Sequence, residues 1–464
     1  MSVARRQVGS RPPGDFPSMN ERLFGTDGVR GTAGGYPLDP ATVARLGAAL
    51  VRVLSAGGRT PRLLVGRDTR ESGPGIEAAL AAGIAAEGAS LTSAGVLPTP
   101  AVAHVTRAGG FDAGLVISAS HNPFADNGIK VFSGHGVKLA EDQERRVEAL
   151  VADPGLQTPG LAAVRATPAD YTRDYLDHLR RALPDPDRLS GLTLAVDAAN
   201  GAMSVVAPRL FRELGFDVAV LHAAPDGRNI NDQCGSTHPE SLARAVVAGG
   251  HRLGAAFDGD GDRAIFVDAA GRVVDGDAVL LVCAKHLKSA GRLPGSLVVA
   301  TVMSNIGLEI ALGDAGIALV RCPVGDRYVM EAMAAHGARL GGEQSGHVIF
   351  SEFLPTGDGL LTALQVLAVM ADSGRELGDL AGDLIQYPQV LLNVPVARKP
   401  ALDAVPRLVE SMAEVEARLG GRGRLLVRYS GTEPLLRIMI EGERQQEIET
   451  WASELADRAR EELG

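Results

Sequence analysis

The chain has 464 residues, more than one ordinary hydrophobic core holds, so we expect several domains. Its 45% hydrophobic and 22% charged residues exclude a disordered chain and a fibre. The formal net charge of −10 gives no support to nucleic acid or a membrane surface as a partner, and three widely spaced cysteines without a CxxC pair favour a reducing, cytoplasmic compartment.

The N-terminal stretch, residues 1–20, has early arginines but no apolar core before its prolines and glycines. It lacks the pattern of a secretory signal, so we expect a disordered extension, with Met19 as an alternative start of the chain. No run of about 18 apolar residues follows, and the sequence therefore predicts no membrane-spanning helix.

Three successive segments share one plan. In each, a β-rich apolar run ends in a polar turn, a stretch with helical spacing follows, and a second apolar run ends in another polar turn. This order is typical of βαβ units, so we expect three related α/β domains with mixed sheets covered by helices. The paired runs begin at Arg62 and Gly114, at Leu192 and Leu253, and at Ser296 and Ala338.

The C-terminal part of the chain differs from these three segments. From Tyr387 onward the pattern predicts strand, helix, two hairpin strands and helix, which is a smaller α+β domain. Ligands of α/β sheets bind beyond the carboxyl ends of strands, where the polar turns fall, so we expect the turns to face one central cleft. The predicted domains are 21–170, 171–271, 272–386 and 387–464, after the extension 1–20.

The first polar motif, FGTDGVRG, places Arg30 on a glycine-rich turn at the start of the first domain. A guanidinium there can lean over a phosphate, although this motif is weak when taken alone. The prediction that Arg30 binds a phosphate depends on the motifs that follow.

The motif SASHNPFADNGIK presents Ser120 beside His121, with Lys130 further on. Most serines in such turns only satisfy backbone groups, so a nucleophilic or phosphorylated Ser120 is a hypothesis. The neighbours strengthen it, because His121 and Lys130 can exchange protons or neutralise charge, although His121 can equally be a structural partner of the loop. Asn122-Pro123 and Asn127-Gly128 predict a rigid, doubly turned loop.

The motif DGDGDR is the most specific short signal in the chain. Glycines at 259 and 261 allow a tight backbone turn, so that Asp258, Asp260 and Asp262 converge on one cation. Three hard oxygen ligands with an incomplete shell suit Mg²⁺, whereas the Glu that ends a calcium-binding EF-hand loop is missing. The alternative is an acidic hairpin turn.

The motif GGEQSGH sets Glu343, Ser345 and His347 at alternate positions after a strand. If the backbone stays extended, the three side chains share one face and can bind vicinal hydroxyls. The alternative is a polar loop with a hydrogen-bonded histidine.

The motif RYSGTEPLLR lies between two apolar strands of the C-terminal domain. Hydroxyls, exposed backbone N–H groups and planar guanidinium groups make a phosphate cradle. The alternative is a basic hairpin on a solvated surface. The residues concerned are Arg428, Ser430, Gly431, Thr432 and Arg437.

Together the motifs describe the movement of a phosphoryl group on a sugar phosphate. A serine, a cation cluster, a hydroxyl-binding face and a phosphate cradle follow one another in four successive domains. A Mg²⁺-dependent sugar phosphatase would use the same carboxylates but has no need of the Glu343 face and the Arg428 cradle. A non-catalytic sugar-phosphate sensor would need no intact serine.

The segments SASHNPFADNGIK, DGDGDR, GGEQSGH and RYSGTEP, in this order, resemble the α-D-phosphohexomutase family over essentially the whole chain after residue 20. The resemblance implies three related α/β domains and a fourth domain of the TATA-box-binding-protein-like type. LFGTDGVRG, VGDRYV and TGDGLLTALQVL favour the bacterial branch that acts on glucosamine phosphates.

The resemblance also implies roles for individual residues. Ser120 is the serine that carries a phosphoryl group, and it completes a Mg²⁺ site, one ion per chain, with Asp258, Asp260 and Asp262. Residues implied around the transferring group or in proton transfer are Arg30, His121, Lys130, Arg263 and His347. Residues implied in substrate binding are Glu343, Ser345, Asp326, Arg327, Arg428, Ser430, Gly431, Thr432 and Arg437.

The activity that the resemblance implies is interconversion of glucosamine 6-phosphate and glucosamine 1-phosphate through a 1,6-bisphosphate. Glucosamine or glucose 1,6-bisphosphate is the expected activator. A phosphomannomutase or phosphoglucomutase is the alternative within the family, because the substrates differ mainly at C2 and one altered contact discriminates by only ~1 to 3 kcal/mol. The assembly stays open between a monomer and a homodimer.

Overall fold

The computed structural model describes residues 22–55, 58–156, 164–430 and 433–464. The predicted N-terminal extension, Met19, and the cradle residues Gly431 and Thr432 lie outside the described residues. The chain forms two compact units. One comprises the chain up to Met303 together with Leu319–Ala381, and the other comprises Ser304–Ala318 with Gly382–Gly464.

The first sheet has the strand order β1-β5-β4-β2-β3-β6. Strand β2 pairs in parallel with β3 and β4, β3 in parallel with β6, and β5 runs antiparallel to β4 and β1, so the sheet is mixed as predicted. The strands are β1 Val29–Thr32, β2 Arg62–Arg67, β3 Ser90–Val96, β4 Ala113–Ile117, β5 Asp126–Ser133 and β6 Thr167–Pro168. The helices are α1 Pro40–Leu54, α2 Gly73–Ala86, α3 Thr99–Ala108 and α4 Glu141–Ala152.

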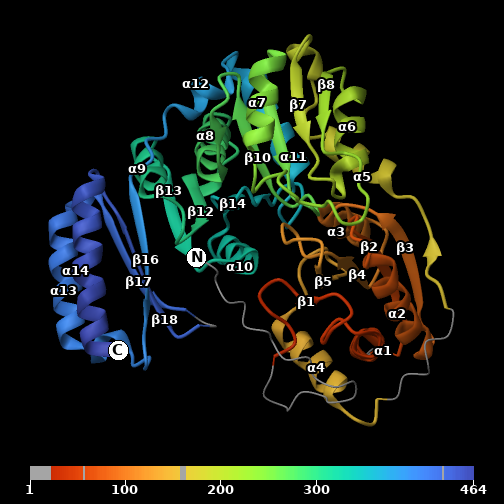
Figure 1. The fold of residues 1–464 in the computed structure, drawn as a ribbon. Coiled ribbons are helices and arrows are strands. Elements are labelled where there is room, and N and C mark those ends of the chain that lie inside the picture. The colour runs from red at the N-terminus through yellow and green to blue at the C-terminus, as the bar shows by residue number, and fades with distance from the viewer. Residues whose placement is uncertain (1–21, 56–57, 157–163, 431–432) are drawn as a thin grey trace. The chain divides into compact units, whose positions relative to one another are not determined.

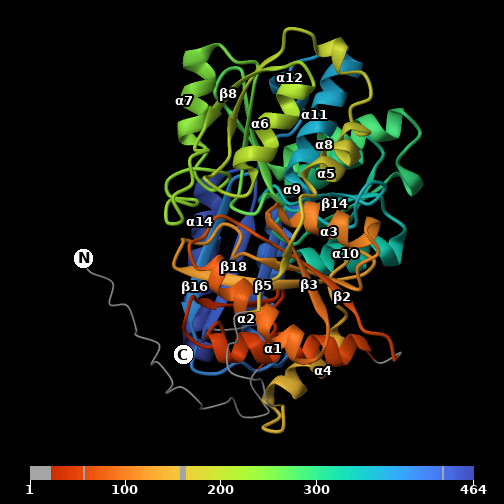
Figure 2. The ribbon, with the colours of Figure 1, turned by 90° about the vertical axis from the view of Figure 1, so that its right-hand side faces the viewer.

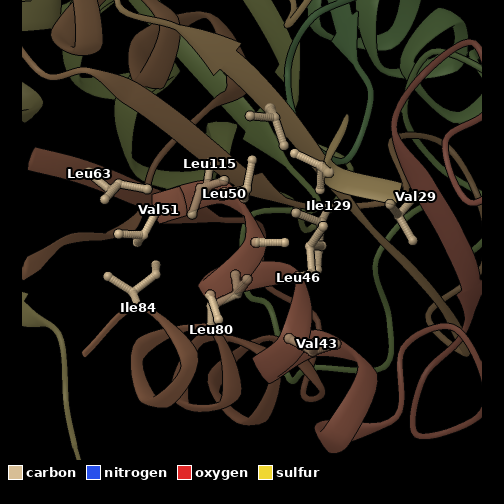
Figure 3. Packing of buried hydrophobic residues seen from close by; sticks show 14 of the residues in the cluster. Val29, Val43, Leu46, Leu50, Val51, Leu63, Leu80, Ile84, Leu115 and Ile129 are labelled. Carbon is tan, nitrogen blue, oxygen red and sulfur yellow. The ribbon is translucent and has the colours of Figure 1, made fainter. Parts of the chain in front are cut away.

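Both faces of this sheet are covered by helices. Helices α1, α2 and α4 lie on one side and α3 lies on the other (Figures 1 and 2). Side chains of α1, such as Leu50, lie between Leu80 of α2 and Leu115 of β4 (Figure 3). Helices α1 and α2 approach backbone to backbone, because a Cβ on Gly83 would stand 1.8 Å from the carbonyl oxygen of Ala44. The polar turn after β4 therefore starts from an inner strand of a sheet that is packed on both faces.

The second sheet has the order β11-β10-β9-β7-β8. Strands β7, β8 and β9 are parallel, so their carboxyl ends, which carry polar loops, meet at one edge. The strands are β7 Thr193–Asp197, β8 Asp217–Leu221, β9 Leu253–Phe257, β10 Ala264–Asp268 and β11 Val273–Val274. The helices around it are α5 Thr172–Arg180, α6 Met203–Glu213 and α7 Glu240–Gly249 (Figure 1).

The third sheet has the order β13-β12-β14-β15. Strand β14 pairs in parallel with β12 and antiparallel with β15. Its strands are β12 Leu297–Thr301, β13 Ala318–Cys322, β14 Leu340–Gly342 and β15 Val348–Phe350, and the helices of this part are α8 Gly276–Ser289, α10 Asp326–His336, α11 Gly359–Ser373 and α12 Leu377–Ala381.

The C-terminal unit contains α9 Ile306–Asp314 and the antiparallel sheet β16-β18-β17. The elements after Tyr387 are β16 Gln389–Pro395, α13 Pro406–Leu419, β17 Arg424–Tyr429, β18 Leu435–Glu441 and α14 Gln445–Leu463. This confirms the predicted order of strand, helix, two hairpin strands and helix. Helices α13 and α14 cover one face of the sheet (Figure 1) and share one apolar core with it.

Short 3-10 turns complete the described chain at Pro186–Leu189, Pro294–Ser296, Leu402–Ala404 and Gly420–Arg422. None of the helices in the described part combines the length and the apolar character that a membrane crossing requires.

Candidate active site

Ser120 lies in the turn that joins β4 to β5 and is only 1% exposed. Its φ of 51° lies in the left-handed region, which costs a non-glycine residue about 1–2 kcal/mol. Asn127 and Gly128 do not form the second turn that was predicted, because both belong to β5, where Gly128 pairs with Arg30 of β1. The predicted glycine-rich turn does form, between Gly25 and Gly28, but Arg30 lies beyond it in β1.

A buried ion pair holds the backbone of Ser120. Asp68 and Arg70, both fully buried, pair with each other beneath the turn. Asp68 accepts a 2.5 Å hydrogen bond from Oγ of Ser118, which in turn accepts the N–H of Ser120 at 2.9 Å. Arg70 donates to the carbonyl oxygens of Ser120 at 3.2 Å and Asn122 at 2.5 Å. The left-handed turn is thus fixed at both its N–H and its carbonyl group.

The second sheet supports the same turn from its carboxyl edge. Nδ2 of Asn231 donates to the carbonyl oxygens of Ser120 at 2.9 Å and Asn122 at 3.1 Å. A Cβ on Gly259 would stand 2.6 Å from the carbonyl oxygen of Ser120. The DGDGDR turn therefore needs glycine at 259 for close approach to the serine turn, and at 261 because φ there is 74°.

The three aspartates of DGDGDR converge as predicted. Asp258, Asp260 and Asp262 are buried after β9, and each offers a carboxylate oxygen within 4.8 Å of the others. The hydroxyl of Ser120 donates a 2.5 Å hydrogen bond to Oδ2 of Asp258. Burial, with the charges of Asp262 and Asp260, raises the pKa of Asp258 well above its usual range. A divalent cation would supply the positive charge that keeps all three groups ionised.

Lys130 supplies positive charge beside this cluster. Its ammonium, 2% exposed, donates to Oδ2 of Asp260 at 2.8 Å and of Asp262 at 3.0 Å. Burial alone would lower the pKa of Lys130, but Asp260, Asp262 and Asp27 outweigh it and hold the pKa well above the usual range. Lys130 therefore stays charged at neutral pH.

The remaining carboxylate oxygens fit a cation. Within the described residues, Oδ1 of Asp260 and Oδ1 of Asp262 are buried without a hydrogen-bond partner. Buried oxygens of this kind are costly unless a proton or a cation satisfies them. The other oxygen of Asp260, Oδ2, accepts a 2.5 Å hydrogen bond from the hydroxyl of Thr99 at the start of α3. The cluster thus leaves two buried acceptor oxygens for the hard divalent cation that its oxygen ligands favour.

Two histidines flank the cluster, and their pKa values shift in opposite directions. Burial, with the charges of Arg263 and Arg30, lowers the pKa of His121 to about 4, so its ring is neutral at pH 7. Nδ1 of this ring lies 3.3 Å from Oγ of Ser120. Burial would also lower the pKa of His347, but the carboxylate of Asp262, 3.7 Å from Nδ1, raises it.

Asp27 is a site residue that sequence reasoning missed. Its carboxylate pairs with Arg30 and with Lys138, 2.6 Å away, and lies 3.3 Å from Lys130. Burial opposes ionisation, yet the nearby Lys130, Lys138 and Arg30 lower the pKa of Asp27. Lys138 also reaches Oδ1 of Asp326 at 2.6 Å, so the predicted substrate residue Asp326 is engaged in an ion pair with the first domain.

The predicted substrate residues of the third domain differ in burial and in their partners. Arg327 pairs with Glu144 of α4, at 2.9 Å for one of its nitrogens. Glu343 is buried and accepts the N–H of Gly325 at 3.0 Å. Ser345 is exposed, and its Oγ donates to Oε2 of Glu343 at 3.3 Å. The expectation of an extended backbone here is wrong, because the N–H of Glu343 donates to the carbonyl oxygen of His347 and the chain reverses between them. The two strands β14 and β15 form a hairpin around this motif.

A cleft of about 800 Å³ collects most of these groups within one unit. Ser120 and Lys130 are too buried to line it. The predicted residues that line it are Arg30, His121, Asp262, Arg263, Asp326, Arg327, Glu343 and His347.

The cradle residues belong to the other compact unit and are described separately. Arg428 of β17 and Arg437 of β18 stand directly opposite each other in the antiparallel register. Like charges in this position repel unless an anion lies beside them, and Glu433, 3.2 Å from Nη2 of Arg437, already supplies one such anion. Oγ of Ser430 accepts the N–H of Glu433 at 3.3 Å, and Lys399, which sequence reasoning missed, donates to the carbonyl oxygen of Ser430 at 2.6 Å. Three cations therefore gather at the end of this hairpin.

Comparison with known families accounts for nearly the whole chain. Four domain families match in order, each described as Phosphoglucomutase/phosphomannomutase: alpha/beta/alpha domain I at residues 21–157, domain II at 173–271, domain III at 275–387 and the C-terminal domain at 391–458.

Individual relatives agree with these families. A phosphoglucosamine mutase of Solibacter usitatus is 49% identical over 96% of this chain and 100% of its own length. The crystal structure of a phosphoglucomutase/phosphomannomutase family protein from Burkholderia thailandensis is 25% identical, with a TM-score of 0.79 over 96% of this chain and 98% of that one. An Aspergillus fumigatus N-acetylphosphoglucosamine mutase, solved with GlcNAc-6P and magnesium, shares the fold at 18% identity, with a TM-score of 0.67 over 97% of both chains.

Proposed function

Because this chain belongs to the phosphoglucomutase/phosphomannomutase family, we propose that it interconverts glucosamine 6-phosphate and glucosamine 1-phosphate. The relative from Solibacter usitatus, at 49% identity, bears the name phosphoglucosamine mutase. The observation that carries the chemistry is the 2.5 Å contact between the hydroxyl of Ser120 and Oδ2 of Asp258, which puts a nucleophile at a cation cluster. The enzyme is thus an isomerase that works by phosphoryl transfer.

The first half-reaction starts from Ser120 carrying a phosphoryl group. A hydroxyl oxygen of the sugar phosphate attacks phosphorus, the bond between phosphorus and Oγ of Ser120 breaks, and a 1,6-bisphosphate forms. The hydroxyl proton passes to a base beside Ser120, and the released Oγ takes up a proton. His121 is placed to accept this proton, because its ring is neutral and its Nδ1 lies 3.3 Å from Oγ of Ser120. The second half-reaction reverses these steps with the other phosphate.

Positive side chains stabilise the charge on the transferring group. A phosphoryl transfer with a loose transition state needs positioning and charge neutralisation above all, and a bound Mg²⁺ supplies part of both. Asp258, Asp260 and Asp262 would hold this ion, one per chain. Arg263 lines the cleft beside them, and Lys130, tied to Asp260 and Asp262, holds the cluster in place.

The non-reacting phosphate belongs, in this proposal, to the C-terminal hairpin. Arg428 and Arg437 stand opposite each other on one face, with Lys399 close to Ser430, and an anion would relieve their repulsion. A cradle that accepts either phosphate permits the bisphosphate to turn over between the two half-reactions. Glucosamine or glucose 1,6-bisphosphate would then activate unphosphorylated enzyme by loading Ser120.

The setting of this activity is part of the proposal. We place the enzyme in the cytoplasm, where sugar phosphates are made, because its buried cysteines form no disulfide among the described residues. We propose a homodimer as the assembly. Analytical ultracentrifugation decides between this dimer and a monomer.

A phosphomannomutase or phosphoglucomutase is the second candidate, because the family description covers both. The deciding measurement is kcat/KM on glucosamine 6-phosphate, glucose 6-phosphate and mannose 6-phosphate. Each assay contains Mg²⁺ and a trace of the matching 1,6-bisphosphate, and intact mass reports the phosphorylation of Ser120. A strong preference for the amino sugar supports the proposal, while equal or better turnover of glucose or mannose phosphate replaces it with the second candidate.

Two further readings are tested in the same assays. Release of free phosphate, without formation of the isomeric sugar phosphate, would identify a phosphatase. Binding of the sugar phosphate without any product would identify a sensor. Either result contradicts the mutase proposal.

A further inference from the structure

A second group of metal-ligating side chains lies in the second domain, outside the aspartate cluster. Asp197 ends β7, His222 follows β8, and Cys234 lies in the loop between β8 and α7. Strands β7 and β8 are parallel neighbours, so the three residues meet at the carboxyl edge of one sheet. We propose that Asp197, His222 and Cys234 form a binding site for a divalent cation of the zinc class.

The spacing of the three ligand atoms suits such an ion. One carboxylate oxygen, one imidazole nitrogen and one sulfur all lie within 4.8 Å of one another. In a tetrahedral site with bonds of about 2.0 Å to oxygen and nitrogen and 2.3 Å to sulfur, the ligand atoms stand roughly 3.3–3.6 Å apart. Nδ1 of His222 and Oδ2 of Asp197 are 3.0 Å apart, which is close to this separation.

One ring nitrogen of His222 lacks a hydrogen-bond partner within the described residues. Its Nδ1 is shielded from solvent and, within the described residues, makes no hydrogen bond that meets the directional requirement, despite the short distance to Asp197. Oδ2 of Asp197 already accepts the N–H of Gly235, whereas Nδ1 of His222 has no such partner. A cation bound by the two side chains would give this nitrogen a partner. His222 is the ligand with access to solvent, since its side chain is 32% exposed.

Asp197 is oriented as metal-bound carboxylates commonly are. Its Oδ1 accepts the N–H of Ala199 at 2.9 Å, and its Oδ2 accepts the N–H of Gly235 at 3.0 Å. Such outer hydrogen bonds fix a ligand before the ion arrives. Gly235 follows Cys234 directly, so the same contact also brings the thiol to the carboxylate.

The ligand types distinguish this site from the aspartate cluster. Thiolate and imidazole favour zinc, cobalt and related ions, whereas three carboxylates favour magnesium. The thiol of Cys234 is fully buried. A catalytic cysteine needs an accessible thiolate, so a nucleophilic Cys–His–Asp arrangement does not fit. Metal binding would displace the thiol proton and add positive charge beside Asp197.

The site lies behind the serine turn. Asn231, on the same loop as Cys234, donates to the carbonyl oxygen of Ser120 at 2.9 Å. Asn231 itself is held by a 2.9 Å hydrogen bond from its N–H to the carbonyl oxygen of Ala199, two positions from Asp197. An ion that joins the β7 end to this loop would therefore stabilise a support of the serine turn. The cation is structural in this proposal and takes no part in the reaction.

Cobalt(II) provides the direct test, because a thiolate ligand gives it a near-ultraviolet charge-transfer band. The full chain is titrated with Co²⁺ in excess Mg²⁺, which occupies the aspartate cluster. We expect one equivalent to produce the band, and Zn²⁺ to remove it. The matched pair is Cys234→Ala, which should lose the band, and Cys322→Ala, which changes another buried cysteine and should keep it.

A second variant keeps the test possible if Cys234→Ala does not fold. His222→Asn keeps a residue that accepts the left-handed backbone at this position, where φ is 46°, and removes the imidazole. We expect it to weaken Zn²⁺ binding at least tenfold and to abolish the rise in Tm that Zn²⁺ gives the parent protein. Absence of the band at saturating Co²⁺, or a band that survives Cys234→Ala, overturns the proposal. Neither result bears on the mutase reaction, which is measured with Mg²⁺ alone.

Discussion

The hydroxyl of Ser120 donates a 2.5 Å hydrogen bond to Oδ2 of Asp258, a residue 138 positions later in the chain. This contact joins the turn after β4 to the turn after β9. Phosphorylation must break it, because a phosphorylated Oγ has no proton to donate. In the unphosphorylated enzyme the hydroxyl of Ser120 is bound to Asp258. In the phosphorylated form the carboxylate of Asp258 would be free to bind another partner.

Replacing Ser120 by alanine should abolish sustained turnover. Removal of a nucleophile typically costs 10⁴-fold or more in kcat, about the scale we expect here. The backbone network around the turn does not involve Oγ of Ser120, so the fold and sugar-phosphate binding should persist. Coupled kinetics and calorimetry measure the two properties. Ser133→Ala, at the end of β5, is the control. Parent-level turnover in Ser120→Ala would remove the nucleophile assignment.

Removal of divalent cations should stop the reaction, and Mg²⁺ should restore it. The two buried oxygens of Asp260 and Asp262 that lack partners in the described chain are the basis for this expectation. A chelator-treated sample, assayed before and after Mg²⁺ is added back, gives the measurement. Asp260→Asn should raise the Mg²⁺ concentration needed for half-maximal activity. Full activity in metal-depleted enzyme, verified by elemental analysis, would contradict the cation role.

Arg70 should position Ser120 and stabilise the fold at the same time. Arg70→Met leaves Asp68 buried without its partner, and breaking a buried pair typically costs about 3–5 kcal/mol. Adding Asp68→Asn removes the unpaired charge and should recover much of this free energy of unfolding. The double variant still lacks the donors to Ser120 and Asn122, so kcat should stay low while KM changes little.

Urea unfolding and steady-state kinetics on the parent, the single variant and the double variant separate these effects. Recovery of kcat together with stability in the double variant would show that the pair has only a structural role.

The sequence predicted the parts of the site that are local in the chain. The DGDGDR turn follows β9 as expected, since three aspartates alternating with glycines after an apolar strand leave few other arrangements. The order of elements in the C-terminal domain was also predicted, because alternating strands and an amphipathic helix have distinct periods.

Contacts between distant segments could not be predicted in the same way. Asp27, Arg70 and Asn231 act through partners that lie far along the chain, and nothing in their local sequence marks these partners. The extended backbone expected at Glu343 failed for a local reason: Gly346, with φ of 91°, allows the chain to reverse. The RDTR segment could have suggested Arg70, since a charged pair directly after an apolar strand often supports a neighbouring loop.

Acid should destabilise the protein through a pair of stacked histidines that takes no part in the proposed chemistry. The rings of His104 on α3 and His178 on α5 lie 4.0 Å apart. Burial, with the charges of His104, Arg181 and Arg107, lowers the pKa of His178 to about 3. Burial also lowers the pKa of His104, which faces Arg181, Arg107 and Asp174.

Because the folded pKa of His178 lies below the unfolded value, the unfolded chain binds more protons between the two values. The stability contribution is therefore complete above an unfolded pKa of about 6.5 and is lost as pH falls toward the folded value. From pH 7 to pH 5 this one residue should cost at most about 2 kcal/mol of unfolding free energy.

His178→Phe keeps the stacked ring but removes the titration, so urea unfolding of this variant should depend less on pH between 7 and 5. Exposed His135→Gln is the control and should follow the parent protein. If His178→Phe loses as much stability as the parent over this range, the histidine stack is not the source of the acid sensitivity.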